Sequence, residues 1–385
     1  MVLHNTQARF GAVIAATAAA ALLLAGCASA TPSASSSSGS GDSALVASAQ
    51  KNVDAHTSNT TGFVPTDPIT NIASLKGKTV IYIPAVAAIP IFATSFKAYA
   101  DAFSKVGVTA KLCDGASNPS SVAACFQQAI DTKAGGVILD SLPPVIAQQA
   151  YDAVLAAKIP VALVTTARPD GSPDSVQLGG PDIVAATALA ADAIIASTKG
   201  KAHVLAIRTI DSPTTQEWMD KGGVAELKKC SGCTVTTIDT KSADLANLPS
   251  KVSAALLADP SINYLFPQFS ADVDGVIKGA TDAGRSDLKG TNTVTTTGDL
   301  QKIAAGQTLE YSIGWDTVRE SWMNSDMLMR LMAGQAVDGS KYTEPVRVFN
   351  SKNVKGLDLT QNGWDSSNWY GGTGYQTALE KLWSK

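Results

Sequence analysis

Charged, polar and aromatic side chains follow several short apolar runs of this 385-residue chain. Asp140 follows GVIL, Arg168 lies just beyond VALV, and Asp299 follows VTTTG. Carboxylates accept hydrogen bonds from hydroxyl groups, and a planar guanidinium donates a pair of them. Trp and Phe rings stack on the apolar face of a ligand ring. This mixture of side chains predicts a binding site for a small organic molecule.

The ligand-binding candidates share a position at the end of a strand-like run or in the turn after it. They are Ile91, Phe92, Asp140, Ser141, Thr166, Arg168, Gln216, Trp218, Gln268, Phe269, Asp299 and Trp315, with Ile89, Thr165 and Asp211 beside them. In open sheets of parallel strands, ligands bind beyond the carboxyl ends of the strands. The alternative for each residue is capping or packing at the edge of a lobe.

The sequence gives little support for an enzymatic function. It contains no GxSxG, HExxH or GxxxxGK[ST] motif, and His203 is the one histidine within the region of alternating elements. Asp140 and Asp299 could in principle form an acid–base pair, but no residue supplies an activated nucleophile. We therefore expect a binding protein rather than an enzyme, with no cofactor and no metal.

The five cysteines divide into one near the amino terminus, Cys27, and two local pairs, Cys113 with Cys125 and Cys230 with Cys233. Even pairing in an exported chain favours a disulfide in each pair. The second pair is a CxxC, for which a redox centre or half of a zinc site is the alternative. It follows a predicted helix instead of opening one, and the chain has three histidines, so neither alternative is favoured.

The first 26 residues have the features of an export signal. Arg9 is positive, residues 12–24 are almost all apolar, and Leu24-Ala25-Gly26-Cys27 matches the bacterial lipobox. This match implies a signal peptide over 1–26, lipidation of Cys27 and a Ser-rich flexible tether over 27–60. An ordinary secreted protein with a chance cysteine is the alternative.

Composition and length limit the remaining possibilities. The chain is 45% hydrophobic and 16% charged with a formal charge of -3, so no nucleic-acid patch stands out. No second apolar run approaches the length of a membrane span. About 310 to 340 residues remain after the signal and tether, which on length alone suggests two domains.

Strand-like and helix-like segments alternate along the rest of the chain. The strand-like runs are TVIYIP, VTAKLC, GVILD, VALVTT, HVLAIR, VTTID, YLFP and VTTTG, each separated from the next by a helix-length segment. Such a series predicts α/β lobes with doubly wound parallel sheets. The length and the break near Gly179-Gly180-Pro181 favour two lobes with a ligand cleft between them.

In the order of its elements the chain resembles the periplasmic-binding-protein type I family, especially its sugar-binding branch related to ribose- and galactose-binding proteins. The segments that carry this resemblance are IPIFATSFKAYADAF, CFQQAIDTKAGGVILDS, LAAKIPVALVTT and IDSPTTQEWMDKGG. It implies an N-terminal lobe over 76–180 plus 316–335 and a C-terminal lobe over 181–312 plus 345–385. It also implies a substrate-binding protein of an ABC importer.

The sequence departs from the sugar-binding pattern at three positions. Ile89 stands where the family has Asn, Thr165-Thr166 replaces Asp-Arg, and Phe269-Ser270 replaces Asn-Asp. We expect a monomer, lipid-anchored on the outer side of the membrane, that delivers a sugar to a permease. A more apolar or aromatic solute, and a receptor that signals to a membrane sensor, are the alternatives.

Overall fold

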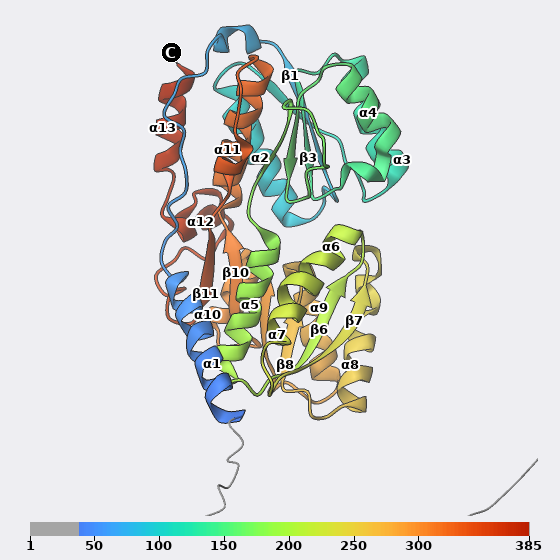
Figure 1. The fold of residues 1–385 in the computed structure, drawn as a ribbon, viewed down its shortest axis with the longest axis vertical. Helices are drawn as coiled ribbons and strands as arrows, with labels where there is room; N and C mark the ends of the chain where they lie inside the picture. Colours follow the sequence, from blue (N-terminus) through green and yellow to red (C-terminus); the bar gives the residue numbers. More distant parts are fainter. Residues whose placement is uncertain (1–37, 385) are drawn as a thin grey trace, which may run out of the picture. The chain divides into compact units, whose positions relative to one another are not determined.

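The structure is a computed structural model that describes residues 38–384 (Figure 1). The predicted signal peptide over 1–26 and the predicted lipidation of Cys27 lie outside these residues. Two α/β lobes make up the described part of the chain, each built on its own sheet. This architecture confirms the fold class predicted from the alternating strands and helices.

The first lobe, drawn in the upper half of Figure 1, contains a five-stranded parallel sheet in the order β2-β1-β3-β4-β5. Its strands are β1 (Thr79–Pro84), β2 (Thr109–Leu112), β3 (Gly136–Asp140), β4 (Val161–Val164) and β5 (Val176–Gly179). Their residues are almost continuously apolar because helices cover both faces.

Alternate residues of β1 point to opposite faces of this sheet, so each face has its own core. Val80 and Tyr82 pack with one core, and Ile81 and Ile83 with the other. The first core is covered by α2 (Pro90–Ser104), α11 (Thr317–Met332) and α13 (Gly374–Trp383), and the second by α3 (Pro119–Asp131) and α4 (Gln148–Ala156).

The second lobe contains a six-stranded sheet in the order β11-β10-β9-β8-β6-β7. Its strands are β6 (His203–Thr209), β7 (Thr234–Thr240), β8 (Tyr264–Pro267), β9 (Lys289–Thr293), β10 (Leu309–Trp315) and β11 (Val346–Asn350). All neighbours are parallel except β10 and β11, which are antiparallel.

Helices also cover both faces of the second sheet. One face carries α1 (Ser38–Ala55), α5 (Ile183–Ser197), α6 (Pro213–Glu217) and, after a π-helical turn over Trp218–Val224, α7 (Ala225–Leu227). The other carries α8 (Leu248–Ala258) and α9 (Ser270–Asp282). Near β11, α10 (Thr297–Ala304) packs in one buried cluster with Trp364 of α12 (Gln361–Asp365) and with Trp369.

Short 3₁₀ turns complete the described part of the chain. They are η1 (Ile72–Leu75), η2 (Pro144–Ala147), η4 (Ser242–Asn247), η5 (Gly339–Tyr342) and η6 (Asn368–Tyr370). Three of these turns, η2, η4 and η5, reach the cavities described below.

Two parts of the expected domain organisation differ in the structure. The tether was predicted as flexible coil over 27–60, but Ser38–Ala55 is the helix α1, whose Ala49 and Val53 are buried against α5. The range 345–385 was assigned to the second lobe, but α13 buries Leu379 and Trp383 in the core of the first lobe. In both cases burial of a few apolar side chains decides the position of a terminal helix.

The main chain passes between the lobes at the predicted break. Gly180 follows β5 and leads into α5, and its amide donates a hydrogen bond to the Tyr342 carbonyl (3.1 Å). The second crossing leads from η5 to β11 through Glu344, whose amide donates to the Gly180 carbonyl (3.2 Å). The third crossing joins β10 to α11 through Asp316. We call these three crossings the hinge; Gly180, Thr343 and Trp315 beside them line the cavities described below.

Both predicted disulfides are present. Cys113 at the end of β2 is bonded to Cys125 in α3, with 5.7 Å between their Cα atoms. Cys230 is bonded to Cys233 in the turn before β7, with 5.3 Å between their Cα atoms. Among the described residues, no group of three or more His, Cys, Asp and Glu side chains could hold a metal ion, so the zinc alternative for the CxxC finds no further ligands there.

Candidate ligand-binding cleft

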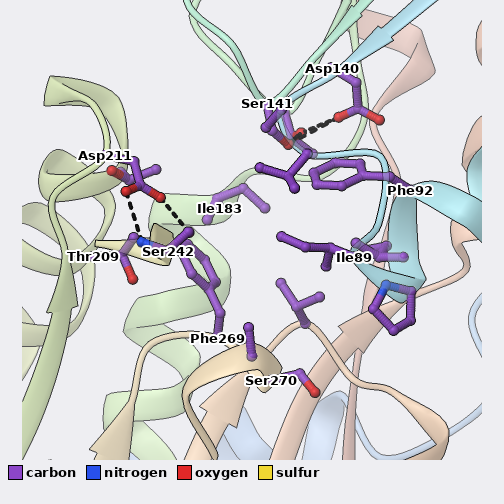
Figure 2. Close-up of a pocket in the computed structure, with 18 of the residues that line it drawn as sticks. Ile89, Phe92, Asp140, Ser141, Ile183, Thr209, Asp211, Ser242, Phe269 and Ser270 are labelled. Atoms are coloured by element: carbon purple, nitrogen blue, oxygen red, sulfur yellow. Dashed lines mark hydrogen bonds between the residues drawn. The ribbon is translucent and has the colours of Figure 1, made fainter. Parts of the chain in front are cut away.

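A cavity of about 360 Å³ lies between the lobes, at the carboxyl ends of the strands of both sheets. Figure 2 shows Phe92, Asp140 and Ser141 of the first lobe facing Thr209 and Phe269 of the second. Because parallel strands present loops and helix amino termini at this end, the fold gathers polar side chains there.

Asp140 ends β3 and is the polar centre of the first-lobe wall. Its Oδ2 accepts a hydrogen bond from the Tyr82 hydroxyl (2.8 Å), and its Oδ1 accepts from the hydroxyls of Thr165 and Ser141 (both 3.0 Å). Burial raises the pKa of Asp140 to about 6, although these three hydroxyls oppose the shift. The carboxyl group is therefore fixed in position and retains lone pairs for a ligand.

Backbone conformation brings the two hydroxyls to Asp140. Ser141 has φ of 58° and Thr165 has φ of 45°, although neither is glycine. Such left-handed residues cost free energy and cluster at functional sites. Here they turn the chain sharply after β3 and β4, which places both hydroxyls on one carboxylate oxygen.

Glu320 lies in the first turn of α11 and also lines the cavity. Its Oε2 accepts a hydrogen bond from Trp315 Nε1 (2.8 Å), whereas its Oε1 is buried and has no hydrogen-bond partner among the residues that the structure describes. Burial, and next the charge of Asp140, raise the pKa of Glu320 well above its usual range.

Apolar side chains of both lobes line the rest of the cleft. Phe92 lies in the first turn of α2, where it is 8% exposed. Ile183, Trp218 and Trp315 form one buried cluster with Phe269 packed against it, and the Trp218 and Phe269 rings meet edge to face at 6.1 Å. A ligand in this cavity would contact aromatic rings of both lobes.

The second-lobe wall is built from helix and turn amino termini. Asp211 accepts hydrogen bonds from the Ser242 amide (3.0 Å) and hydroxyl (2.5 Å). Asp272 accepts from the Phe269 amide (3.0 Å), and Asp299 accepts from the Thr296 amide (2.8 Å). Burial raises the pKa of Asp272 to about 7. These carboxyl groups hold the loops after β6, β8 and β9 in place.

The structure gathers eight of the twelve predicted ligand-binding residues around this cavity. They are Ile91, Phe92, Asp140, Ser141, Trp218, Phe269, Asp299 and Trp315, and the neighbouring Ile89, Thr165 and Asp211 line it as well. Their contact with a ligand remains a prediction.

The other four lie elsewhere. Thr166 and Arg168 line a neighbouring cavity, and the Arg168 guanidinium donates to the carbonyls of Val176, Ser172 and Pro173 at 2.8 to 3.1 Å. Gln268 is fully buried, accepting from the Thr209 amide and donating to the Thr215 carbonyl. Gln216 lines neither cavity. The expected placement of these four in the cleft is corrected.

Several cleft residues escaped the sequence analysis, among them Ile183, Thr209, Ser242, Asp272 and Glu320. Thr209 is the last residue of β6 and could have been found by its strand-end position. Glu320 lies five positions after Trp315 in a helix that is buried throughout its first turns, so strand ends alone do not indicate it.

Among the described residues, no helix has both the length and the apolar character needed to cross a membrane. No curated protein matches the chain at a significant level.

Solved structures with the same fold include a sugar ABC transporter protein from Yersinia enterocolitica, with 18% identity and a TM-score of 0.71 over 84% of this chain and 99% of that one. A 5-methylthioribose transporter solute-binding protein from Thermotoga lettingae has 15% identity and a TM-score of 0.69, and the match covers 80% of this chain and 97% of that one. A solute-binding protein from Burkholderia graminis, in complex with D-arabinose, has 19% identity and a TM-score of 0.65, covering 73% and 98%.

The family model described as "Periplasmic binding protein domain" matches residues 80–336, which include β1 of the first lobe and α11 at the hinge. Its members are extracytoplasmic binding proteins rather than enzymes, as the sequence predicted. On this match, which spans more than half of its length, the chain belongs to the periplasmic binding protein family.

Proposed function

We propose that this protein captures a sugar in the cleft and delivers it to an ABC importer, while a lipid on Cys27 holds it to the outer side of the membrane. The observation that carries the proposal is the cavity of about 360 Å³ between the lobes, which combines fixed carboxyl groups with aromatic rings. That volume lies within the range of small-molecule sites.

The cleft offers both kinds of contact that a sugar ring uses. Hydroxyl groups of the ligand would donate to Asp140, while its apolar face would lie on Phe92 or Phe269. Two of the similar structures are complexes with 5-methylthioribose and with D-arabinose. Their low identity to this chain leaves the ligand to be inferred from the cleft itself.

A binding screen tests the ligand. Thermal shift and calorimetry with neutral aldoses and polyols should identify a ligand, because a ligand at about 100 times its Kd adds about 2.7 kcal/mol to the free energy of unfolding. Asp140→Asn and Phe92→Ala should each weaken binding about tenfold or more. Loss of binding only in Phe92→Ala and Phe269→Ala would favour an apolar solute instead.

Fractionation tests the anchor. The apolar run before Leu24-Ala25-Gly26-Cys27 supports processing and acylation at Cys27. The wild-type protein should sediment with membranes, and Cys27→Ser should remain unprocessed or be released. A wild-type protein that is soluble after signal cleavage would contradict the anchor without affecting the ligand site. We expect the protein to act as a monomer beside its permease.

A further inference from the structure

Two buried polar atoms in the cleft have no hydrogen-bond partner among the described residues: Glu320 Oε1 and Thr209 Oγ1. Their residues are 5% and 3% exposed. Glu320 belongs to α11 of the first lobe and Thr209 ends β6 of the second, so the two atoms come from opposite walls. A buried polar group without a partner is costly, so each one in the cleft calls for an explanation.

The Glu320 carboxyl group is held so that one oxygen remains available. Trp315 Nε1 fixes Oε2, and Oε1 lies beside Gly180, where a Cβ atom would collide with it. Gly180 has φ of 104° and forms part of the crossing between the lobes. The space around Oε1 therefore depends on a glycine at this position.

The ionisable groups that face the cleft are almost all carboxyl groups. Its described lining contains Asp140, Asp211, Asp272, Asp274, Asp299 and Glu320, against Lys302, which is paired with Asp274 (2.9 Å). Arg168 lies in the neighbouring cavity, where its guanidinium is bonded to backbone carbonyls. A carboxylate or phosphate on the ligand would meet carboxyl groups without a free cation to offset them.

We propose that Glu320 is a specificity-determining residue whose Oε1 forms a hydrogen bond with an uncharged or amine-bearing ligand, and that the cleft excludes sugar acids and sugar phosphates. This inference rests on the proposed function and narrows its ligand class. The aromatic rings of Trp218, Phe269 and Trp315 suit the same ligands, because their faces attract neutral rings and cations.

A charge-matched panel tests the inference by calorimetry on the purified protein. The probes are D-ribose, D-glucose, D-glucosamine, D-glucuronate and glucose 6-phosphate. We expect binding among the first three and none of the last two. Glu320→Ala should weaken binding of the probe roughly tenfold or more, because it removes the hydrogen-bonding Oε1 from the cleft. Glu380→Ala, an identical change on the surface of α13, is the control and should bind like wild type.

Each other result has a defined meaning. Binding of an acidic probe as tight as that of its neutral counterpart, or unchanged or tighter binding by Glu320→Ala, would overturn the inference and leave the proposed function standing. No binding by any probe would overturn the sugar-binding function and the inference with it. If Glu320→Ala fails to fold, Thr209→Val probes the opposite wall, where we expect a several-fold loss of affinity, and unchanged affinity would again contradict the inference.

Discussion

Asp272 is a buried carboxyl group at the amino terminus of α9, 2% exposed, and its Oδ2 accepts from the Phe269 amide at 3.0 Å. Burial raises its pKa to about 7, the Phe269 hydrogen bond opposes the shift, and the charge of Asp211 adds to it. The folded protein therefore binds a proton here, between about pH 4 and 7, that the unfolded chain releases.

Because this pKa is raised on folding, its contribution to stability is complete below the unfolded value and disappears as pH rises through about 7. Asp272→Asn should remove this pH-dependent loss of stability, because the amide cannot ionise. Its oxygen can still accept the hydrogen bond from the Phe269 amide. In urea unfolding, the free energy of unfolding should fall less from pH 5 to pH 8 for the variant than for the wild type, by roughly a few kcal/mol.

Asp274→Asn provides the comparison for this measurement, because its side chain is 85% exposed two residues further along the same helix. It should follow the wild-type pH dependence. If the free energies of unfolding of wild type and Asp272→Asn differ by the same amount at pH 5 and at pH 8, the pKa of Asp272 is not raised.

Strand-end position predicted much of the site but could not give the direction of each side chain. Asp140, Phe269 and Trp315 line the cleft as expected, since the carboxyl ends of parallel strands meet there. Gln268 directly precedes Phe269, yet its side chain points into the lobe and bonds backbone groups. Neighbouring residues of an extended chain point to opposite sides, and only the assembled sheet decides which side faces the ligand.

The sequence does not predict the helix α1. Its segment is rich in Ser, Ala and Gly, has little amphipathic character and follows a Ser-rich tract, all of which favour coil. The buried apolar face of α1 is small: Ala49 and Val53, four positions apart, lie on one side of the helix and pack against α5. Tertiary contact therefore supplies the stability that local propensity does not.

A charge on the buried face of α1 should test this contact. Val53 is 1% exposed, so Val53→Asp should lower the free energy of unfolding by about 3 kcal/mol. Lys51→Asp introduces the same residue at an exposed position of the helix and should change it by less than about 1 kcal/mol. Equal unfolding midpoints in urea for the two variants would mean that α1 is not packed in solution.

At the scale of the whole molecule, the lobes are joined by more than the three central crossings. After α1, residues 56–71 run from the second lobe to the first, beside α13 in Figure 1. We call this segment the strap. Arg347 of β11 donates to the Thr57 carbonyl (3.2 Å), and Arg330 of α11 donates to the Asp67 carbonyl (2.7 Å). One continuous segment is thus fixed to both lobes.

The strap also passes over the hinge. Gly62 packs against the Arg319 guanidinium, which donates to the Phe63 carbonyl (2.5 Å) and pairs with Glu344. A two-lobe binding protein opens to load and closes to hold its ligand, and a ligand shifts that equilibrium by its preference for the closed form. A strap bonded on both sides of the hinge should restrict the opening.

Gly62→Val tests this role, because a side chain at Gly62 would collide with the Arg319 guanidinium and displace the strap. Gly374→Val is its control, since a Cβ there meets open space. By small-angle scattering, the unliganded Gly62→Val protein should have a larger radius of gyration than wild type and contract more on binding a sugar. The affinity of Gly62→Val for the sugar should fall in proportion to the population of the closed form, which means a few-fold for a modest shift toward the open form. If Gly62→Val only lowers the melting temperature and contracts as wild type does, the strap stabilises the fold without limiting its opening.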